Sequence, residues 1–189
     1  MRLILTRHGE TIDNLKKICQ GQNDGPLSEK GIDQAKKLAL RFKDRKIDAI
    51  YSSELRRTIN TAKEILKYHP NLNLNIDKRI SERFLGKFQG KTFPANWDWK
   101  NLPEDVESDE AICKRAKEFI EDIYSKNKGK TVLVIGHGGS IKALLTVIHN
   151  KPSSDCGTWE SGKNTSVSEL DIKNGENKMH LFNCASHIE

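Results

Sequence analysis

Two short apolar runs, each ending in a histidine–glycine pair, are the strongest constraint on how this chain folds. The first run, Leu3–Leu5, leads into the tetrapeptide TRHG at 6–9. The second, Val132–Ile135, leads into GHGG at 136–139. Unbroken apolar runs of this length are typical of strands buried on both faces, as in a parallel sheet covered by helices. We therefore expect both runs to be interior strands.

Helical spacing of apolar residues fills most of the chain between these strands. The pattern predicts helices over about 28–43, 54–68, 109–123 and 141–148, with Ser28, Ser53 and Ser108 as candidate N-caps. Further strands are predicted over 47–51 and 72–76, and a hairpin joins 166–172 to 178–182 around Asn174-Gly175. Strands that alternate with helices predict a three-layer αβα sandwich with a mostly parallel central sheet.

The length of 189 residues is typical of a single domain, which we expect to span residues 1–189. One segment, about 84–107, follows neither the helical nor the strand period and contains Trp97 and Trp99. We expect it to form a small inserted cap over the edge of the sheet. The two tryptophans would pack this cap onto the body, or stack against an apolar leaving group.

Composition excludes several classes of protein. The longest apolar run has four residues, far below the roughly 20 that a membrane span requires. The first apolar stretch is too short for a signal peptide, and the four cysteines are widely separated without a CxxC pair. We expect a cytoplasmic protein with no membrane association, no bound metal, no cofactor and reduced thiols. The oligomeric state stays open.

Positive charge is concentrated in the first half of the chain. Residues 1–94 carry 20 Lys and Arg against 11 Asp and Glu, whereas the whole chain has a net charge of +6. Such a bias fits either a nucleic acid or a small anionic substrate. No nucleic-acid-binding motif accompanies it, so we expect a small anion and no nucleic acid.

The two histidine–glycine pairs predict where that anion binds. Ligands of open α/β sheets bind outside the carboxyl ends of the strands, and His8 and His137 both follow such ends. Arg7 adds a planar guanidinium suited to bidentate binding of an oxyanion. Either histidine alone would be interpreted as a packing residue. Two of them at equivalent positions, one beside an arginine, favour an anion-binding crevice.

Six segments, taken in order, resemble the histidine phosphatase superfamily, which includes the cofactor-dependent phosphoglycerate mutases. They are TRHGET at 6–11, DGPLS at 24–28, YSSELRRT at 51–58, SERF at 81–84, IGHGGSI at 135–141 and NTSV at 164–167. Together they cover nearly the whole chain, and their order is that of the family.

The resemblance implies phosphoryl transfer through a phosphohistidine. His8 would be the nucleophile, with an acceptor on its other ring nitrogen to fix the tautomer. Arg7, Arg56 and a protonated His137 would surround the phosphoryl oxygens, where the charge of the transition state is stabilised electrostatically. Glu82 would protonate the leaving alkoxide and then deprotonate the attacking water.

Further residues are assigned smaller parts by the same resemblance. Asn14 would donate to the phosphoryl group, and Gln20, Gly21 and Gly138 would contact phosphate or substrate. Lys87 and Lys91 would extend a positive rim toward a second anionic group. Arg57 and Arg83 are expected to be structural or peripheral.

Three functions stay open at this point. A metal-independent phosphatase acting on a small phosphorylated metabolite is favoured, because the mutases usually have Asn where this chain has Gly139 and Tyr where it has Leu85. The first alternative is a phosphoglycerate mutase, which needs a more enclosing cap to exclude water. The second is a non-catalytic phosphate-binding protein, although both His8 and Glu82 are present.

Overall fold

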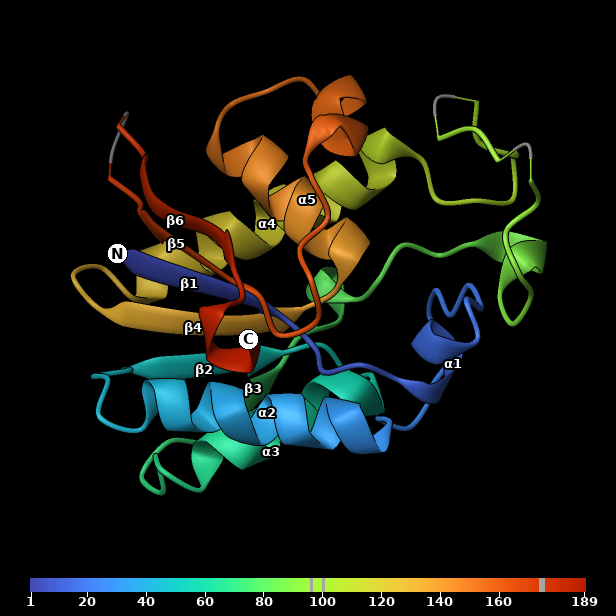
Figure 1. The fold of residues 1–189 in the computed structure, drawn as a ribbon. Helices are drawn as coiled ribbons and strands as arrows, with labels where there is room; N and C mark the ends of the chain where they lie inside the picture. Colours follow the sequence, from blue (N-terminus) through green and yellow to red (C-terminus); the bar gives the residue numbers. More distant parts are fainter. Residues whose placement is uncertain (96, 100, 174–175) are drawn as a thin grey trace.

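A six-stranded sheet forms the centre of the molecule (Figure 1). The computed structural model describes residues 1–95, 97–99, 101–173 and 176–189. The strands are β1 (Arg2–Arg7), β2 (Ala49–Ser52), β3 (Leu74–Ile76), β4 (Thr131–Gly136), β5 (Val167–Asp171) and β6 (Lys178–Cys184). Their order is β3-β2-β4-β1-β5-β6; the first four are parallel and β5 and β6 are antiparallel. The predicted mostly parallel sheet is confirmed.

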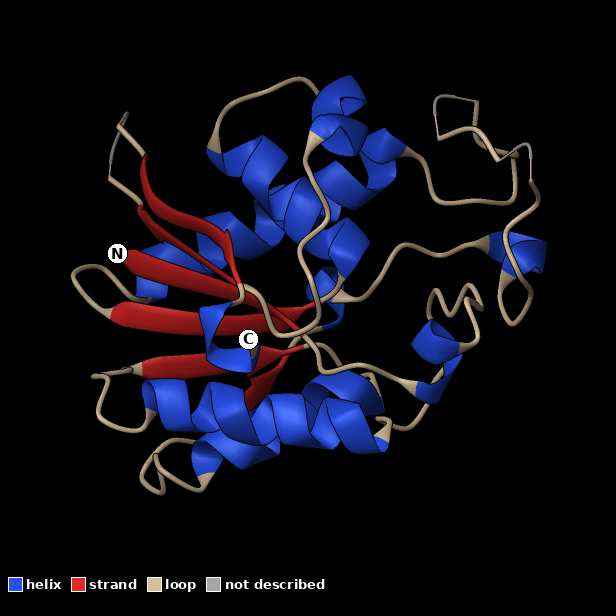
Figure 2. Ribbon diagram, in the orientation of Figure 1, coloured by secondary structure: helices blue, strands red, loops and turns tan. Residues whose placement is uncertain are grey.

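Helices cover both faces of this sheet (Figure 2). The main helices are α2 (Glu29–Phe42), α3 (Arg56–Leu66), α4 (Asp109–Lys126) and α5 (Gly138–Ile148), with α2 and α3 on one face and α4 and α5 on the other. Shorter elements are α1 (Ile12–Leu15) and the 3-10 turns η1 (Lys78–Ile80), η2 (Gly86–Phe88), η3 (Ser153–Thr158) and η4 (Ser186–Ile188). The arrangement is the expected three-layer αβα sandwich.

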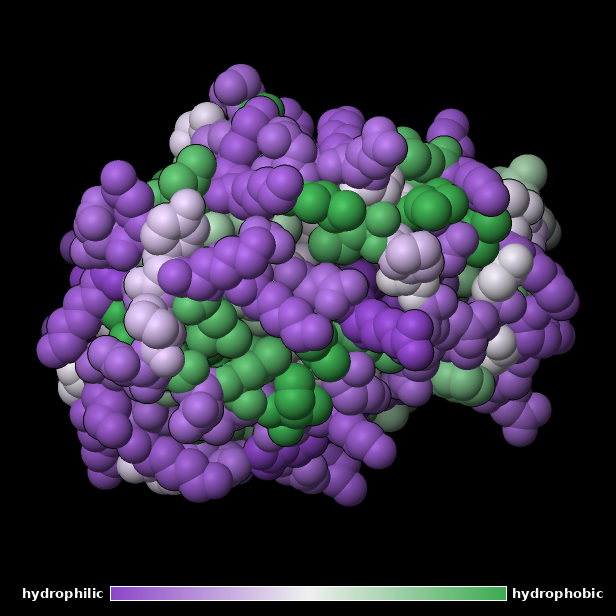
Figure 3. All heavy atoms as spheres, turned by 90° about the horizontal axis from the view of Figure 1, so that it is seen from below, coloured by the Kyte–Doolittle hydropathy of each residue, from purple (hydrophilic) through white to green (hydrophobic). Residues whose placement is uncertain are grey.

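Two apolar cores, one on each face, hold the layers together. Successive side chains of a strand point to opposite faces. Leu3 and Leu5 of β1 therefore pack with α4 and α5, whereas Ile4 packs with α2 and α3. All three are essentially inaccessible to solvent. Seen from the side of α2 and α3, the surface is mainly hydrophilic with hydrophobic side chains near its middle (Figure 3).

The predicted N-caps are confirmed in two of three cases. Ser28 Oγ accepts from the Gly31 amide at 3.0 Å, and Ser108 Oγ accepts from the Ala111 amide at 3.2 Å. The prediction of Ser53 as a cap is wrong, since α3 follows Leu55 without a side-chain cap. The Ser53 hydroxyl is 2.8 Å from Nε2 of His137, so it serves the second histidine instead.

The segment 84–107 lies at the carboxyl ends of the strands, beside α1 (Figure 1). Cys19 exchanges backbone hydrogen bonds of 2.7 and 2.8 Å with Lys91 and Gly90. Leu85 and Val106 pack on Cys19 in a small separate core, with Trp97 against it. The predicted turn Asn174-Gly175 lies outside the described residues. No described helix has the length and apolar character needed to cross a membrane.

Candidate active site

The side chain of His8 lies where β1 ends, and it is 3% exposed. Its Nδ1 is 2.7 Å from the carbonyl oxygen of Gly9. A carbonyl oxygen only accepts, so Nδ1 carries the proton and donates it. In the neutral ring Nε2 then keeps its lone pair. The turn that follows β1 therefore fixes the tautomer that a nucleophilic imidazole needs.

Burial and nearby arginines keep His8 in this neutral form. Burial is the main reason that the pKa of His8 lies well below its ordinary value, and the charges of Arg57 and Arg7 lower the pKa further. The hydrogen bond to Gly9 acts in the opposite direction. At neutral pH the ring is therefore an uncharged base surrounded by cations, a setting in which it can attack an anionic phosphorus centre.

His137, at the start of α5, lies next to His8, with 5.2 Å between the ring centroids. Its Nδ1 accepts a 3.1 Å hydrogen bond from Arg57 Nε, so its Nε2 carries the proton and donates to Ser53 Oγ. Burial, followed by the charge of Arg57, holds the pKa of His137 well below its ordinary value. The expected protonated ring is therefore not found, because a second buried cation beside the arginines is unfavourable.

Arg7 enters the site from the end of β1. Its Nη1 donates to the carbonyl of Gly162 at 3.0 Å, whereas its buried Nε has no partner within the described part of the chain. Burial lowers the pKa of Arg7, and the charge of Glu82 partly offsets that effect. An unpaired buried N–H is costly, so Arg7 presents a donor that an incoming oxyanion would satisfy.

The second arginine of the site is Arg57, and the prediction of Arg56 for this role is wrong in placement. Arg57 is 1% exposed, and its Nη1 and Nη2 donate to the carbonyls of Asn23 and Gly21, both at 2.7 Å. The side chain of Arg56 is 78% exposed, and its Nε lies 3.5 Å from Asp24. Neighbouring residues of a helix point about 100° apart, so only one of the two can face the sheet edge.

Glu82 completes the set from the segment that follows η1. Its Oε1 accepts from the backbone amides of Gly139, at 2.9 Å, and Arg83, at 2.8 Å. A Cβ at Gly139 would lie 2.4 Å from that oxygen, so this close approach requires glycine. Glu82 is thereby tied to the first turn of α5, and its charge acts on both Arg7 and Arg57.

Asn14 and Gln20 both belong to the wall of the site, and Thr11 holds the amide oxygen of each side chain. Asn14 Oδ1 accepts from the Thr11 amide at 3.2 Å and from Asn164 Nδ2 at 3.3 Å, so the NH2 of its side-chain amide points away from both donors. Gln20 Oε1 accepts from the Thr11 hydroxyl at 2.8 Å, while its buried Nε2 lacks a partner among the described residues. The Asn14 amide therefore has N–H groups available to an anion, whereas the Gln20 Nε2 lies close to Gly25, where a Cβ would be 2.4 Å from it.

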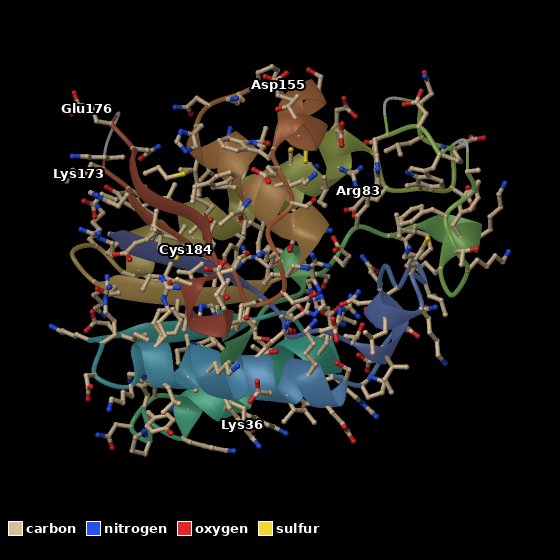
Figure 4. The ribbon with its side chains drawn as sticks, in the orientation of Figure 1. Lys36, Arg83, Asp155, Lys173, Glu176 and Cys184 are labelled. Atoms are coloured by element: carbon tan, nitrogen blue, oxygen red, sulfur yellow. The ribbon has the colours of Figure 1, made fainter. Side chains whose placement is uncertain are left out.

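A cavity of about 290 Å³ lies at the carboxyl ends of the strands, and Arg7 and Glu82 form part of its wall, whereas His8, His137 and Arg57 do not. It is lined by Arg7, Asn14, Ile18, Cys19, Gln20, Gly21, Glu82, Arg83, Leu85, Phe93, Trp99, Asp109, Gly138, Gly139, Lys142, Cys156, Gly157 and Ser161. The predicted contacts Gly21 and Gly138 thus lie at its wall. Lys87 and Lys91, expected to form a positive rim, do not line the cavity. Arg83, expected to be peripheral, lies at the wall where segment 84–107 begins (Figure 4).

A family model confirms the resemblance of the motifs. The model for the histidine phosphatase superfamily, branch 1, matches residues 3–185. This chain belongs to the histidine phosphatase superfamily. Relatives in that superfamily include phosphoserine phosphatase 1 of Hydrogenobacter thermophilus, which is 31% identical over 202 residues. That match covers 100% of this chain and 94% of the relative.

Solved structures of the histidine phosphatase superfamily share the whole fold. The structure of Bacillus stearothermophilus YhfR matches with a TM-score of 0.91 and 30% identity, covering 100% of this chain and 99% of that one. Phosphoserine phosphatase of Entamoeba histolytica, in complex with 3-phosphoglyceric acid, matches with a TM-score of 0.86 and 26% identity. That match covers 100% of this chain and 99% of the other.

Proposed function

We propose that this protein is a phosphatase that hydrolyses monoesters of small phosphorylated metabolites through a phosphohistidine at His8. The observation that carries the proposal is the state of that ring. It is buried, neutral, protonated on Nδ1 through Gly9 and free to attack through Nε2. The charges of Arg57 and Arg7 act on this ring, and the buried Nε of Arg7 has no hydrogen-bond partner among the described residues.

The first half-reaction forms a bond between phosphorus and His8 Nε2. The bond from phosphorus to the ester oxygen breaks, and Glu82 gives its proton to the departing alkoxide. Arg7 and Arg57 balance the charge spread over the phosphoryl oxygens. In the second half-reaction Glu82 takes a proton from water, the hydroxide attacks phosphorus, and the bond to Nε2 breaks to release inorganic phosphate. His137 positions Arg57 through its 3.1 Å hydrogen bond.

The proposed substrate class draws on what relatives are named for. Several are phosphoserine phosphatases, and one solved relative holds 3-phosphoglyceric acid. We propose a small phosphorylated metabolite of this kind, acted on without a metal. The four cysteines of this chain are free thiols, which supports action in a reducing compartment such as the cytoplasm.

Hydrolysis of p-nitrophenyl phosphate in excess EDTA tests the proposal. We expect turnover by the wild type and a loss on the order of 10³-fold or more in His8→Ala. His180→Ala is the matched control, because His180 contacts Asp171 on β5, away from the site. A labelled monoester followed by an alkaline quench should leave acid-labile label on His8.

The opposite results would reject the proposal. Turnover that survives in His8→Ala, or an active preparation that never carries label on His8, would exclude the phosphohistidine route. Phosphate binding without turnover would favour the binding protein. Isomerised product from 3-phosphoglycerate, rather than free phosphate, would favour the mutase.

A further inference from the structure

Two cations line the cavity in addition to Arg7, namely Lys142 and Arg83. Lys142 lies on α5, three and four residues after Gly139 and Gly138. Residues with this spacing share one face of a helix, one turn apart. The Lys142 side chain therefore lines the cavity on the same side as the α5 N-terminus, displaced by one turn from the reaction centre.

Lys142 is a cavity cation whose ammonium has no direct partner among the described residues, neither a hydrogen bond nor an ion pair. Burial lowers its pKa, while the charges of Cys156 and Glu82 act in the opposite direction. A half-buried ammonium without a partner is unfavourable, so a ligand anion beside it would be stabilised.

The other cation on this wall is already neutralised. Arg83 forms an ion pair with Asp109 at the start of α4, and its Nη1 donates to the carbonyl of Glu107 at 2.6 Å. The Arg83 side chain is 6% exposed, and its guanidinium lies over the ring of Trp99 at 6.0 Å. The Arg83 side chain (Figure 4) is therefore already paired, and of these two cavity cations only Lys142 lacks an ion pair within the described residues.

We propose that Lys142 selects substrates whose leaving group carries one negative charge, such as a carboxylate a few bonds from the phosphate ester. This inference rests on the proposed function and deepens it. A neutral leaving group would leave the ammonium unpaired. A second phosphate would bring nearly two charges, of which the one unpaired cation offsets only part.

The test compares two closely related esters, 3-phosphoglycerate and glycerol 3-phosphate, which differ only in a carboxylate against a hydroxymethyl group. We expect the wild type to prefer 3-phosphoglycerate in kcat/KM. In Lys142→Met that value should fall by about 10- to 100-fold, mainly through KM, as for loss of a charged hydrogen bond. Turnover of glycerol 3-phosphate should change by less than about 3-fold.

Two further variants sharpen the comparison. Lys142→Arg keeps the charge, so the preference for 3-phosphoglycerate should survive. Lys87→Met removes an exposed lysine that lies over the ring of Phe88 at 5.5 Å and does not line the cavity, so both substrates should be unaffected. Melting temperatures of all variants report whether the fold is intact.

The outcomes separate the two proposals. An equal fall for both esters in Lys142→Met would place Lys142 on the phosphoryl group and overturn the inference. So would an unchanged preference. If no variant turns over any ester, the proposed function fails, and calorimetry on His8→Ala still tests the inference. Lys142→Met in that background must weaken binding of 3-phosphoglycerate more than binding of glycerol 3-phosphate.

Discussion

At the scale of single residues, a sequence motif predicts which residue types form the site but not which of two neighbouring side chains points into it. Segment 51–58 contains two adjacent arginines, and the prediction from the resemblance assigns the phosphate-binding role to Arg56 and a structural role to Arg57. The rotation of α3 decides it. Arg57 points inward to His137, and Arg56 points outward to Asp24. His137 illustrates the same limit, since its neutral state depends on burial beside Arg57.

The two arginines therefore make a matched pair of variants. We expect Arg57→Ala to lower kcat/KM for p-nitrophenyl phosphate by about 10²- to 10³-fold, because a buried donor to the transition state is lost. Arg56→Ala should stay within about 2-fold, because a surface ion pair contributes little. Steady-state kinetics on both variants, with melting temperatures as a check of folding, provides the measurement. The reverse order of effects would restore Arg56 to the site.

At the scale of elements, the long helices and buried strands were predictable because their periodicity runs over many residues. The backbone of the 3-10 turns and of segment 84–107 could not be predicted from the sequence pattern, because contacts with other parts of the chain determine it. Ser53 is an instructive case. Its type and position suit an N-cap, but its hydroxyl has a better partner in His137, which is 84 residues away along the chain.

The junction of Glu82 with α5 gives a prediction at this scale. In Gly139→Ala the new methyl group would meet Glu82 Oε1 at 2.4 Å, so the carboxylate has to move. We expect kcat to fall by about 10²-fold, as for a misplaced general acid, with little change in the melting temperature. Gly157→Ala controls for the addition of a methyl group to the cavity wall, since Gly157 also lines the cavity and a Cβ there meets nothing within 4 Å. Full activity in Gly139→Ala would show that the position of Glu82 is not critical.

At the scale of the whole molecule, folding buries two neutral histidines at the ends of β1 and β4. Their burial makes the free energy of unfolding depend on pH. The pKa values of His8 and His137 are both lowered by folding, whereas in the unfolded chain each titrates near its ordinary 6.5. Below that pH the unfolded chain binds protons that the folded chain does not. Their contribution to stability is therefore full above about pH 6.5 and is lost as the pH falls.

Denaturant unfolding at several pH values measures this effect. Between pH 6.5 and 5 we expect the free energy of unfolding to fall by up to about 1.4 kcal/mol per pH unit for each of the two histidines. His187, with a pKa lowered to about 4, and His149 add to the slope, so the comparison is made with His8→Gln. That variant should have a shallower slope than the wild type. Identical slopes would mean that His8 is not held neutral.

The order of the strands has a consequence for how the protein is made. β1, which ends beside His8, leaves the ribosome long before its neighbours β4 and β5, which are translated more than 100 residues later. Arg2 of β1 pairs with Thr131 of β4 and with Asp171 of β5. Long-range pairing of this kind is slow to form. A nascent chain that lacks residues 167–171 leaves one edge of β1 without its partner, so phosphate binding should arise only after these residues have been translated.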